Sequence, residues 1–175
     1  MATGKNTKRY ETPNHPYQGE RIAQEGDLLG RYGLKNKEEL WRAQSELRNY
    51  RREARRLIGE AQGDLEDAEA SGEEFLTRLR RYGILSEDDD ISRVLGLDVT
   101  DILERRLQTV AYRKGLASTP QQARQFIVHG HVVVGDARVS RPSKKVEVAE
   151  EDGIEFDETS PLADELHPER AEGQE

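Results

Sequence analysis

The fold of this chain is decided by residues 101–145, DILERRLQTVAYRKGLASTPQQARQFIVHGHVVVGDARVSRPSKK. This segment contains nine Arg and Lys residues against three Asp and Glu residues, a net charge of +6. The thirty residues after it contain one Arg against twelve carboxylates, a net charge of −11. A basic segment inside a chain whose formal net charge is −8 is typical of a protein that binds a polyanion through one part of its surface.

Two helices are predicted in the first part of this segment. Asp101 and the glutamate three residues later have the spacing of a capping box, so the first helix is expected to begin at Asp101. Thr119 as the N-cap, Pro120 at the first helical position and Gln122 as the reciprocal cap begin the second helix. Gly130 ends it, as glycine does at many helix C-termini.

A β-hairpin is predicted after the second helix. Residues 131–134 and 137–139 have the composition of strands, and Gly135-Asp136 between them is typical of a two-residue hairpin turn. A further strand is predicted near residues 146–148. The expected fold class is therefore α+β, with a mainly helical N-terminal arm and a small module of two helices and a β-hairpin.

The residues before this segment are expected to be mainly helical after an extended start. The first 33 residues show no sustained period and are predicted to form an extended arm. Apolar residues at three- and four-residue steps predict a helix from about Asn36 to Ile58. Residues 59–74 are expected to form a loop or a poorly packed helix, and residues 73–82 a short amphipathic helix.

The remaining segments are acidic. Residues 87–90 are expected to cap a short helical turn, because carboxylates are favourable at a helix N-terminus. The end of the chain is rich in carboxylates and contains two prolines, which predicts disorder. The expected organisation is an extended arm and helical region over residues 1–100, a basic module over 101–158 and an acidic disordered tail over 159–175.

Composition excludes several classes of protein. The chain has no cysteine, so it has no disulfide and no thiolate metal site. No run approaches the roughly 20 apolar residues that span a bilayer, and the N-terminus lacks the apolar core of a secretory signal. The protein is therefore expected to be soluble and cytoplasmic, with no membrane partner. Its 34% hydrophobic residues against 35% charged residues predict that part of the chain orders only against a partner.

Basic and polar side chains of the two module helices are expected to form one concave surface. Arg106 and Arg113 are seven residues apart and share a helix face, with Arg105 beside them. On the second helix, Arg124 and its neighbouring glutamines face away from the apolar side. Guanidinium groups suit phosphate oxygens because they bind them bidentately and keep their charge. The alternative is that these are ordinary solvated helix faces. Further basic residues at the rim of this surface are Lys114, Arg138, Arg141, Lys144 and Lys145.

A second basic block lies on the predicted helix from Asn36 to Ile58, on the face beside its apolar stripe. Its members are Arg48, Arg51, Arg52, Arg55 and Arg56. The stripe itself contains Trp41 and Tyr50, which are interpreted as core or partner contacts, with base stacking as the alternative.

The segment LERRLQTVAYRKGLASTPQQARQFIVHGHVVVGDARV resembles the RNA-binding module of the ribosomal small-subunit protein four family, in its archaeal and eukaryotic branch. That module also occurs in pseudouridine synthases and some aminoacyl-tRNA synthetases, so alone it indicates RNA binding. Upstream, YGLKNKEELWRAQSELRNYRREARRLI is similar to the helical arm of the ribosomal protein, and FLTRLRRYGIL fits as well. The resemblance covers roughly residues 5–158.

This resemblance implies a structural constituent of the small ribosomal subunit, without cofactor, metal or catalysis. Such a protein binds the helical junction in the 5′ domain of small-subunit ribosomal RNA early in assembly. It contributes to translational accuracy near the side where messenger RNA enters. The expected partners are the ribosomal RNA, neighbouring proteins such as the protein-five family, and messenger RNA.

The resemblance also implies individual RNA contacts. By motif position they fall on Arg105, Arg106, Arg113, Lys114, Gln122, Arg124, His131 and Arg138. The excess of acidic residues outside the basic blocks, with 20 Arg against 7 Lys, favours a member from a salt-adapted archaeon.

Other interpretations of the same residues are weaker. His129 and His131 lack the further ligands of a metal site, and residues 88–90 lack the glycine and terminal Glu of a calcium loop. No phosphate loop or catalytic motif is present. A pseudouridine-synthase relative would need a catalytic domain larger than the residues upstream of Asp101 can form. A standalone RNA-binding assembly or rescue factor leaves the arginine-rich helix unexplained.

Overall fold

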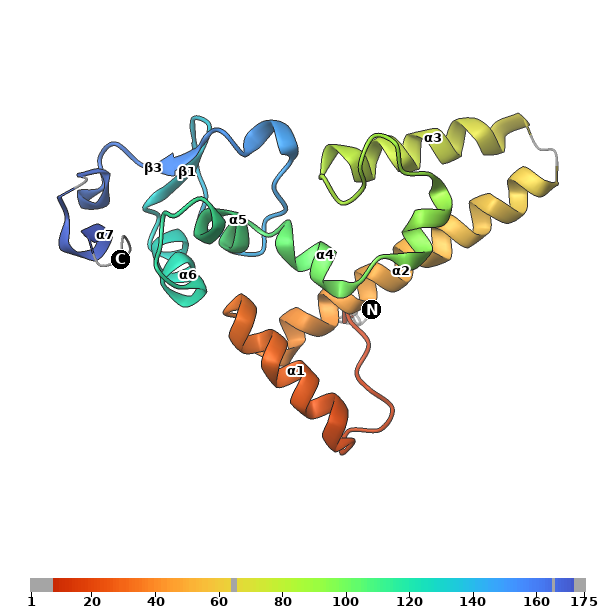
Figure 1. The fold of residues 1–175 in the computed structure, drawn as a ribbon, viewed down its shortest axis with the longest axis horizontal. Coiled ribbons are helices and arrows are strands. Elements are labelled where there is room, and N and C mark those ends of the chain that lie inside the picture. The colour runs from red at the N-terminus through yellow and green to blue at the C-terminus, as the bar shows by residue number, and fades with distance from the viewer. Residues whose placement is uncertain (1–7, 64–65, 165, 172–175) are drawn as a thin grey trace, which may run out of the picture.

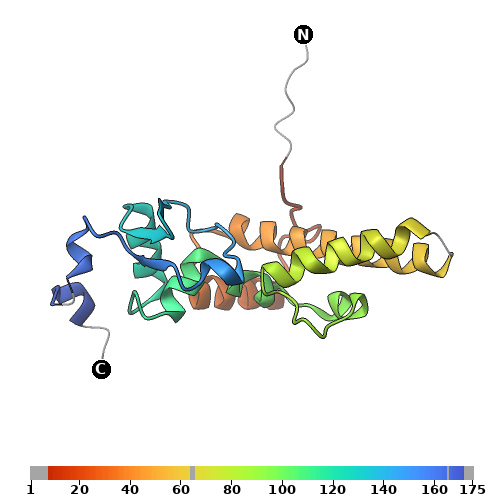
Figure 2. The same ribbon diagram turned by 90° about the horizontal axis from the view of Figure 1, so that it is seen from above.

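The computed structural model describes residues 8–63, 66–164 and 166–171. The molecule is elongated, with a hairpin of two long helices at one end and a small sheet at the other (Figures 1 and 2). Two separate clusters of buried apolar residues divide the chain between Leu103 and Leu107. The described residues up to Glu104 are here called the arm, and residues 105–158 are called the module.

The arm begins with helix α1, Gly19–Tyr32, where an extended segment was expected. The helix ends at Gly33, whose φ of 59° is the left-handed conformation that glycine adopts without a steric penalty. Its stability comes from contacts with the next helix: the indole Nε1 of Trp41 donates to Glu25 at 3.1 Å, and Lys37 lies 3.3 Å from the same carboxylate. Because these partners lie outside the segment, its own polar, glycine-containing sequence did not reveal the helix.

Helix α2, Lys37–Gln62, confirms the helix predicted from Asn36, whose side chain accepts a hydrogen bond from the Glu39 amide at 3.2 Å. It extends past Ile58 and is followed by α3, Glu66–Arg81, which returns alongside it (Figure 1). The loop or poorly packed helix expected over residues 59–74 is therefore largely regular helix, and α3 begins before the predicted start at residue 73.

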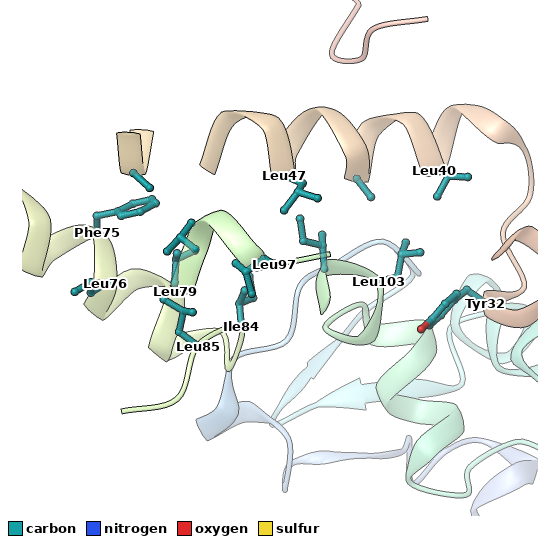
Figure 3. Packing of buried hydrophobic residues seen from close by; sticks show 14 of the residues in the cluster. Tyr32, Leu40, Leu47, Phe75, Leu76, Leu79, Ile84, Leu85, Leu97 and Leu103 are labelled. Atoms are coloured by element: carbon teal, nitrogen blue, oxygen red, sulfur yellow. The ribbon is translucent and has the colours of Figure 1, made fainter. Parts of the chain in front are cut away.

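The apolar core of the arm lies between α2, α3 and the segment that follows them (Figure 3). That segment contains the 3₁₀ helix η1, Ile91–Gly96, and the Asp90 carboxylate accepts from the amides of Ser92 and Arg93 at 3.0 and 3.2 Å. The predicted helical turn capped by the acidic residues is thus confirmed. The core residues labelled in Figure 3 are Tyr32, Leu40, Leu47, Phe75, Leu76, Leu79, Ile84, Leu85, Leu97 and Leu103.

The first module helix predicted from Asp101 is instead two helices, α4, Val99–Glu104, and α5, Leu107–Arg113. The capping interaction lies one turn earlier than predicted, because the Asp101 carboxylate accepts from the amide of Asp98 at 2.7 Å. At the break between the helices, the backbone pairs with the loop over residues 142–146. The Leu107 amide donates to the Lys144 carbonyl at 2.7 Å, and the Val146 amide donates to the Arg105 carbonyl at 2.9 Å. These long-range bonds satisfy backbone groups that a continuous helix would pair locally.

Helix α6, Pro120–Val128, begins as predicted, with the Thr119 hydroxyl accepting from the Gln122 amide at 3.1 Å. The Gln122 side chain accepts in return from the amide of Ser118, one residue before the predicted partner. The chain then turns at Gly130, whose φ is 76°.

The predicted hairpin is present as β1, Val132–Val134, and β2, Ala137–Arg138, with Val134 opposite Ala137. The third strand is β3, Ile154–Phe156, antiparallel to β1, so the sheet order is β2-β1-β3. The strand predicted near residues 146–148 is absent from the structure. Val146 is fully buried in the module core, and the chain continues as the 3₁₀ helix η2, Val148–Glu150.

The segment after the module is ordered where the structure describes it, contrary to the predicted disordered tail. It contains the 3₁₀ helix η3, Pro161–Ala163, and the short helix α7, Pro168–Ala171. Leu162 is only 5% exposed and packs into the apolar cluster of the module. One buried leucine thus fixes a segment whose acidic composition predicted disorder. Among the described helices, none has both the length and the apolar character needed to cross a membrane.

Candidate RNA-binding surface

The arm and the module are joined by a buried ion cluster of Glu39, Arg106 and Arg124, here called the Glu39 ion cluster. The guanidinium of Arg106 lies 2.9 Å from the Glu39 carboxylate, and that of Arg124 lies 2.7 Å from its other oxygen. Burial disfavours the charged form of Glu39, but hydrogen bonds and the positive charge of the two arginines outweigh it and lower the pKa of the carboxyl group. The cluster therefore holds α2 of the arm against α5 and α6 of the module.

A second polar contact supports the same interface. The Gln108 side chain is fully buried and donates to the carbonyls of Gly33 and Pro120 at 2.8 and 2.9 Å. Within the arm, Tyr32 donates from its hydroxyl to Glu104 at 2.8 Å, beside this interface. Buried polar groups that are fully paired fix one relative arrangement of the elements that contribute them.

Arg106 and Arg113 do not share a solvent-facing row, because Arg106, the N-cap of α5, is buried against Glu39. The side chain of Arg106 is 8% exposed, whereas that of Arg113 is 55% exposed and lies 3.0 Å from Glu104. The prediction that Arg106 and Arg113 share one exposed helix face was therefore wrong.

Three more of the predicted RNA-contact residues are held by the acidic segment that follows them. Arg105 forms an ion pair with Glu151 and donates to the Val146 carbonyl at 3.2 Å. The Lys114 ammonium donates to backbone carbonyls, the nearest that of Glu151, and Lys144 lies 2.6 Å from Glu150. Glu150 and Glu151 of the acidic segment are therefore partners of two of these basic residues.

The segment after β3 contacts the other end of the predicted surface. Arg138 lies 2.7 Å from Asp157, and the Nδ1 atom of His131 lies 2.9 Å from the Ser160 hydroxyl. Hydrogen bonds from Thr159 and Arg138 lower the pKa of Asp157 to about 2. The Gln122 side chain donates to Glu169 at 3.0 Å.

The arginines of α2 differ from one another in their partners. Arg51 is half-buried and donates to the Leu97 carbonyl, Arg48 lies 3.3 Å from Glu11, and Arg56 lies 2.8 Å from Glu60. Arg52 and Arg55 are exposed and form no ion pair with any residue that the structure describes. These two arginines are the part of the arm block that is free to meet a polyanion.

A basic pocket of about 800 Å³ lies where the N-terminal segment, α2, the α4–α5 break and the loop before η2 meet, here called the junction pocket. The residues that line it are Lys8, Arg9, Tyr10, Glu38, Glu39, Arg42, Ala43, Glu46, Ile102, Arg106, Ser143 and Lys145. A second hollow of about 330 Å³ shares Ser143 and Lys145 with it and adds Arg141 and Lys144. Four of the predicted contact residues therefore line two adjoining hollows.

Lys145 lies between the two hollows. Its ammonium contacts Glu46, lies 2.7 Å from the Tyr50 hydroxyl and sits 5.5 Å from the centre of the Tyr82 ring. Burial lowers the pKa of Lys145 to about 8, while the Glu46 carboxylate favours its charged form. Tyr50, which the sequence placed on the apolar stripe, is thus both a core residue and a polar partner of this lysine.

Sequence reasoning missed Lys8, Arg9 and Arg42 as candidate contacts. Arg42 lies three residues after Glu39 on α2, so the helical register could have placed it beside the arm–module interface. Lys8 and Arg9 gave no such signal, because their position depends on how the N-terminal segment packs against α2. Among the described residues, no group of three or more His, Asp or Glu side chains could hold a metal ion.

Comparison with known proteins identifies the family of the chain. Residues 105–152 match the S4 domain. The chain is 82% identical over 175 residues to the small ribosomal subunit protein uS4 of Haloquadratum walsbyi, covering 100% of both chains. The chain belongs to the uS4 family. The uS4 protein of Natronomonas pharaonis is 77% identical over 174 residues, covering 99% of this chain and 100% of the relative. That of Methanococcus maripaludis strain C6 is 52% identical over 166 residues, covering 93% and 90%.

The family assignment confirms several predictions. The chain is a ribosomal protein of the small subunit with an S4 RNA-binding domain, and members of the uS4 family are ribosomal constituents rather than enzymes. The high identity to haloarchaeal uS4 proteins fits the predicted salt-adapted archaeal member. The α+β fold class is confirmed as well.

Proposed function

We propose that this uS4 protein binds the helical junction in the 5′ domain of small-subunit ribosomal RNA directly and nucleates assembly of the subunit in the cytoplasm. The observation that carries the proposal is the pair of basic hollows beside the S4 domain, where Arg141, Lys144 and Lys145 meet the arm. A folded RNA junction presents phosphates from several directions, and a concave basic surface can contact more than one of them. In this role the protein lies near the side where messenger RNA enters and contributes to translational accuracy.

The proposed contacts fall into two groups. The module contributes the rim of the hollows, and the arm contributes the exposed arginines Arg52 and Arg55 on α2. Messenger RNA and neighbouring small-subunit proteins, including the protein-five family, are the further partners that we propose. Of the acidic segment, Glu147 and Glu150 line the second hollow beside Arg141 and Lys144.

A high salt concentration changes which interactions contribute to the RNA affinity of such a surface. At 1 M salt the Debye length is about 3 Å, so attraction between separated charges is lost and only close contacts remain. In the module, several of the guanidinium and ammonium groups are already held by carboxylates, as Lys144 is by Glu150 at 2.6 Å. Side chains held in one geometry lose less conformational entropy when they bind, so affinity depends more on shape and close contact than on net charge.

The test is binding of the protein to a transcript of the 5′ domain, measured by filter binding at fixed salt. The Arg141→Glu variant should weaken binding more than about tenfold, since it removes a charge-assisted contact and adds repulsion. Arg93→Glu, on the exposed surface of η1, is the matched control and should change affinity little. Equal losses in both variants would contradict a localised site. Stoichiometric co-sedimentation with the small subunit is the complementary measurement.

A further inference from the structure

The junction pocket contains an excess of positive charge that its own carboxylates do not balance. Glu39 and Arg106 of the Glu39 ion cluster line it, and in that cluster two guanidinium groups share one carboxylate. Arg42 lines the pocket beside them and pairs only loosely, at 3.8 Å, with the exposed carboxylate of Glu38. Glu46 is already bound to Lys145. The acidic residues of the pocket are therefore all engaged.

The most buried cation of the pocket is Arg106, and its charge is not fully balanced. Arg106 as a whole residue is only 7% exposed, and its Nε atom has no hydrogen-bond partner among the described residues. Burial lowers the pKa of Arg106; Glu39 counteracts this, and the nearby charges of Arg124 and Arg42 add to the lowering. Repulsion from two neighbouring guanidinium groups in a partly desolvated site would be relieved by a bound anion.

The mouth of the pocket adds two more cations from the N-terminal segment. Lys8 and Arg9 are exposed and form no ion pair with the residues that the structure describes. The Tyr10 ring forms part of the wall, with the Lys8 ammonium 6.0 Å and the Arg42 guanidinium 5.7 Å from its centre. Cations thus converge on one concavity from the N-terminal segment, α2 and the α4–α5 break.

We propose that the junction pocket is a phosphate-binding site, with Arg9 and Arg42 as its outer ligands and Arg106 beneath them. A guanidinium fork matches the geometry of phosphate oxygens and binds them bidentately. The volume of about 800 Å³ accommodates a phosphate together with an attached nucleoside. This inference rests on the proposed function insofar as the phosphate belongs to RNA; a free phosphate ion would have the same chemistry.

The experiment measures two ligands on the full-length protein and three variants. Arg9→Ala and Arg42→Ala remove the outer ligands, and Arg93→Ala is the control on an exposed surface outside the pocket. Inorganic phosphate is titrated by calorimetry, and binding of the 5′-domain transcript is measured over a series of salt concentrations. Thermal unfolding of each variant checks that the fold is retained, as expected for exposed side chains.

In the phosphate titration, Arg42→Ala should lower the affinity about tenfold, the effect of losing one charge-assisted hydrogen bond. In the RNA-binding measurement, each pocket variant should reduce the slope of log K against log salt by roughly 0.7–0.9, the change expected for one lost phosphate contact. An effect on RNA binding assigns the pocket to an RNA phosphate, and an effect in the phosphate titration alone assigns it to a free anion. Unchanged values in both measurements would overturn the inference.

These measurements distinguish a failure of the proposed function from a failure of the phosphate-site inference. If the wild-type protein binds the transcript tightly and the pocket variants bind it with the same affinity and slope, the proposed function stands and the RNA source is excluded. If the wild-type protein does not bind the transcript, the proposed function fails, and the phosphate titration alone decides whether the pocket binds an anion.

Discussion

The basic residues of the module and those of α2 differ in what holds them. In the module, Arg105 and Arg138 are bound to carboxylates that lie 46 and 19 positions further along the chain. On α2, Arg52 and Arg55 are exposed and have no ion pair with the described residues. The module thus uses these arginines to fix a small sheet and two short helices in place, whereas α2 leaves two of its arginines exposed to solvent.

This contrast changes how the charge pattern of the sequence should be interpreted. The segment with the highest positive charge is also the one whose charges are most fully engaged within the protein. A local excess of arginine therefore indicates where the fold requires acidic partners as well as where RNA binds. Availability for RNA depends on the tertiary partners of each residue.

The largest effect on stability is expected at the Glu39 ion cluster. Glu39→Gln removes the charge that Arg106 and Arg124 share and leaves two guanidinium groups without a counter-charge in a buried site. We expect the free energy of unfolding to fall by about 3–5 kcal/mol, the usual cost of removing one partner of a buried ion pair. Urea denaturation measures it.

The matched control for this change lies one residue away. Glu38→Gln affects only a half-exposed pair at 3.8 Å and should change the unfolding free energy by less than about 1 kcal/mol. If the two variants lost the same stability, Glu39 would not be the residue that joins arm and module.

A smaller effect is expected from the Arg138–Asp157 pair at the other end of the module. The pKa of Asp157 is lowered to about 2 from an ordinary value of 3.8, so this carboxylate stabilises the folded state above pH 4. Its contribution is lost as the pH falls from about 4 towards 2. In Asp157→Asn the stability should be lower at neutral pH and should vary less over this interval. Chemical denaturation at several pH values measures the difference, and an unchanged pH profile would show that Asp157 is unpaired in solution.

The smallest effect on stability, and a distinct effect on binding, is expected on α2. Arg52→Ala together with Arg55→Ala should leave the unfolding free energy within about 0.5 kcal/mol of the wild type, since both side chains are exposed. For binding to the 5′-domain transcript, the slope of log K against log salt should decrease in magnitude by roughly 0.9 for each phosphate contact removed. Arg56→Ala, which removes a residue paired with Glu60, is the control. A slope that falls equally in the control would show that pairing does not limit availability.

Local signals predicted the elements that local interactions stabilise. The helix from Asn36, the Thr119-Pro120 start of α6 and the Gly135-Asp136 turn were each predicted from residues close in sequence, and all three are present. Helix α1 was missed because Glu25 is held by Trp41, which lies outside the segment. Short-range patterns carry no information about such partners.

The break between α4 and α5 and the third strand were missed for a related reason. Arg105 and Leu107 exchange backbone hydrogen bonds with residues about forty positions away, so the apolar pattern alone favoured one continuous helix. The alternation of buried Ile154, exposed Glu155 and buried Phe156 was hidden in an acidic stretch. The junction pocket combines Arg9, Arg42 and Arg106 from three elements, and no spacing in the sequence links them.

The Glu39 ion cluster has a consequence for how a newly synthesised chain folds. Glu39 and Arg124 are 85 positions apart, and closing a loop of that length costs conformational entropy before its contact forms. Domains fold from the N-terminus as the chain is made, so the α2–α3 core can assemble while the residues that will bind Glu39 are not yet present. Docking of the module onto the arm is therefore a late event, because it needs both Glu39 from the arm and Arg124 from the module.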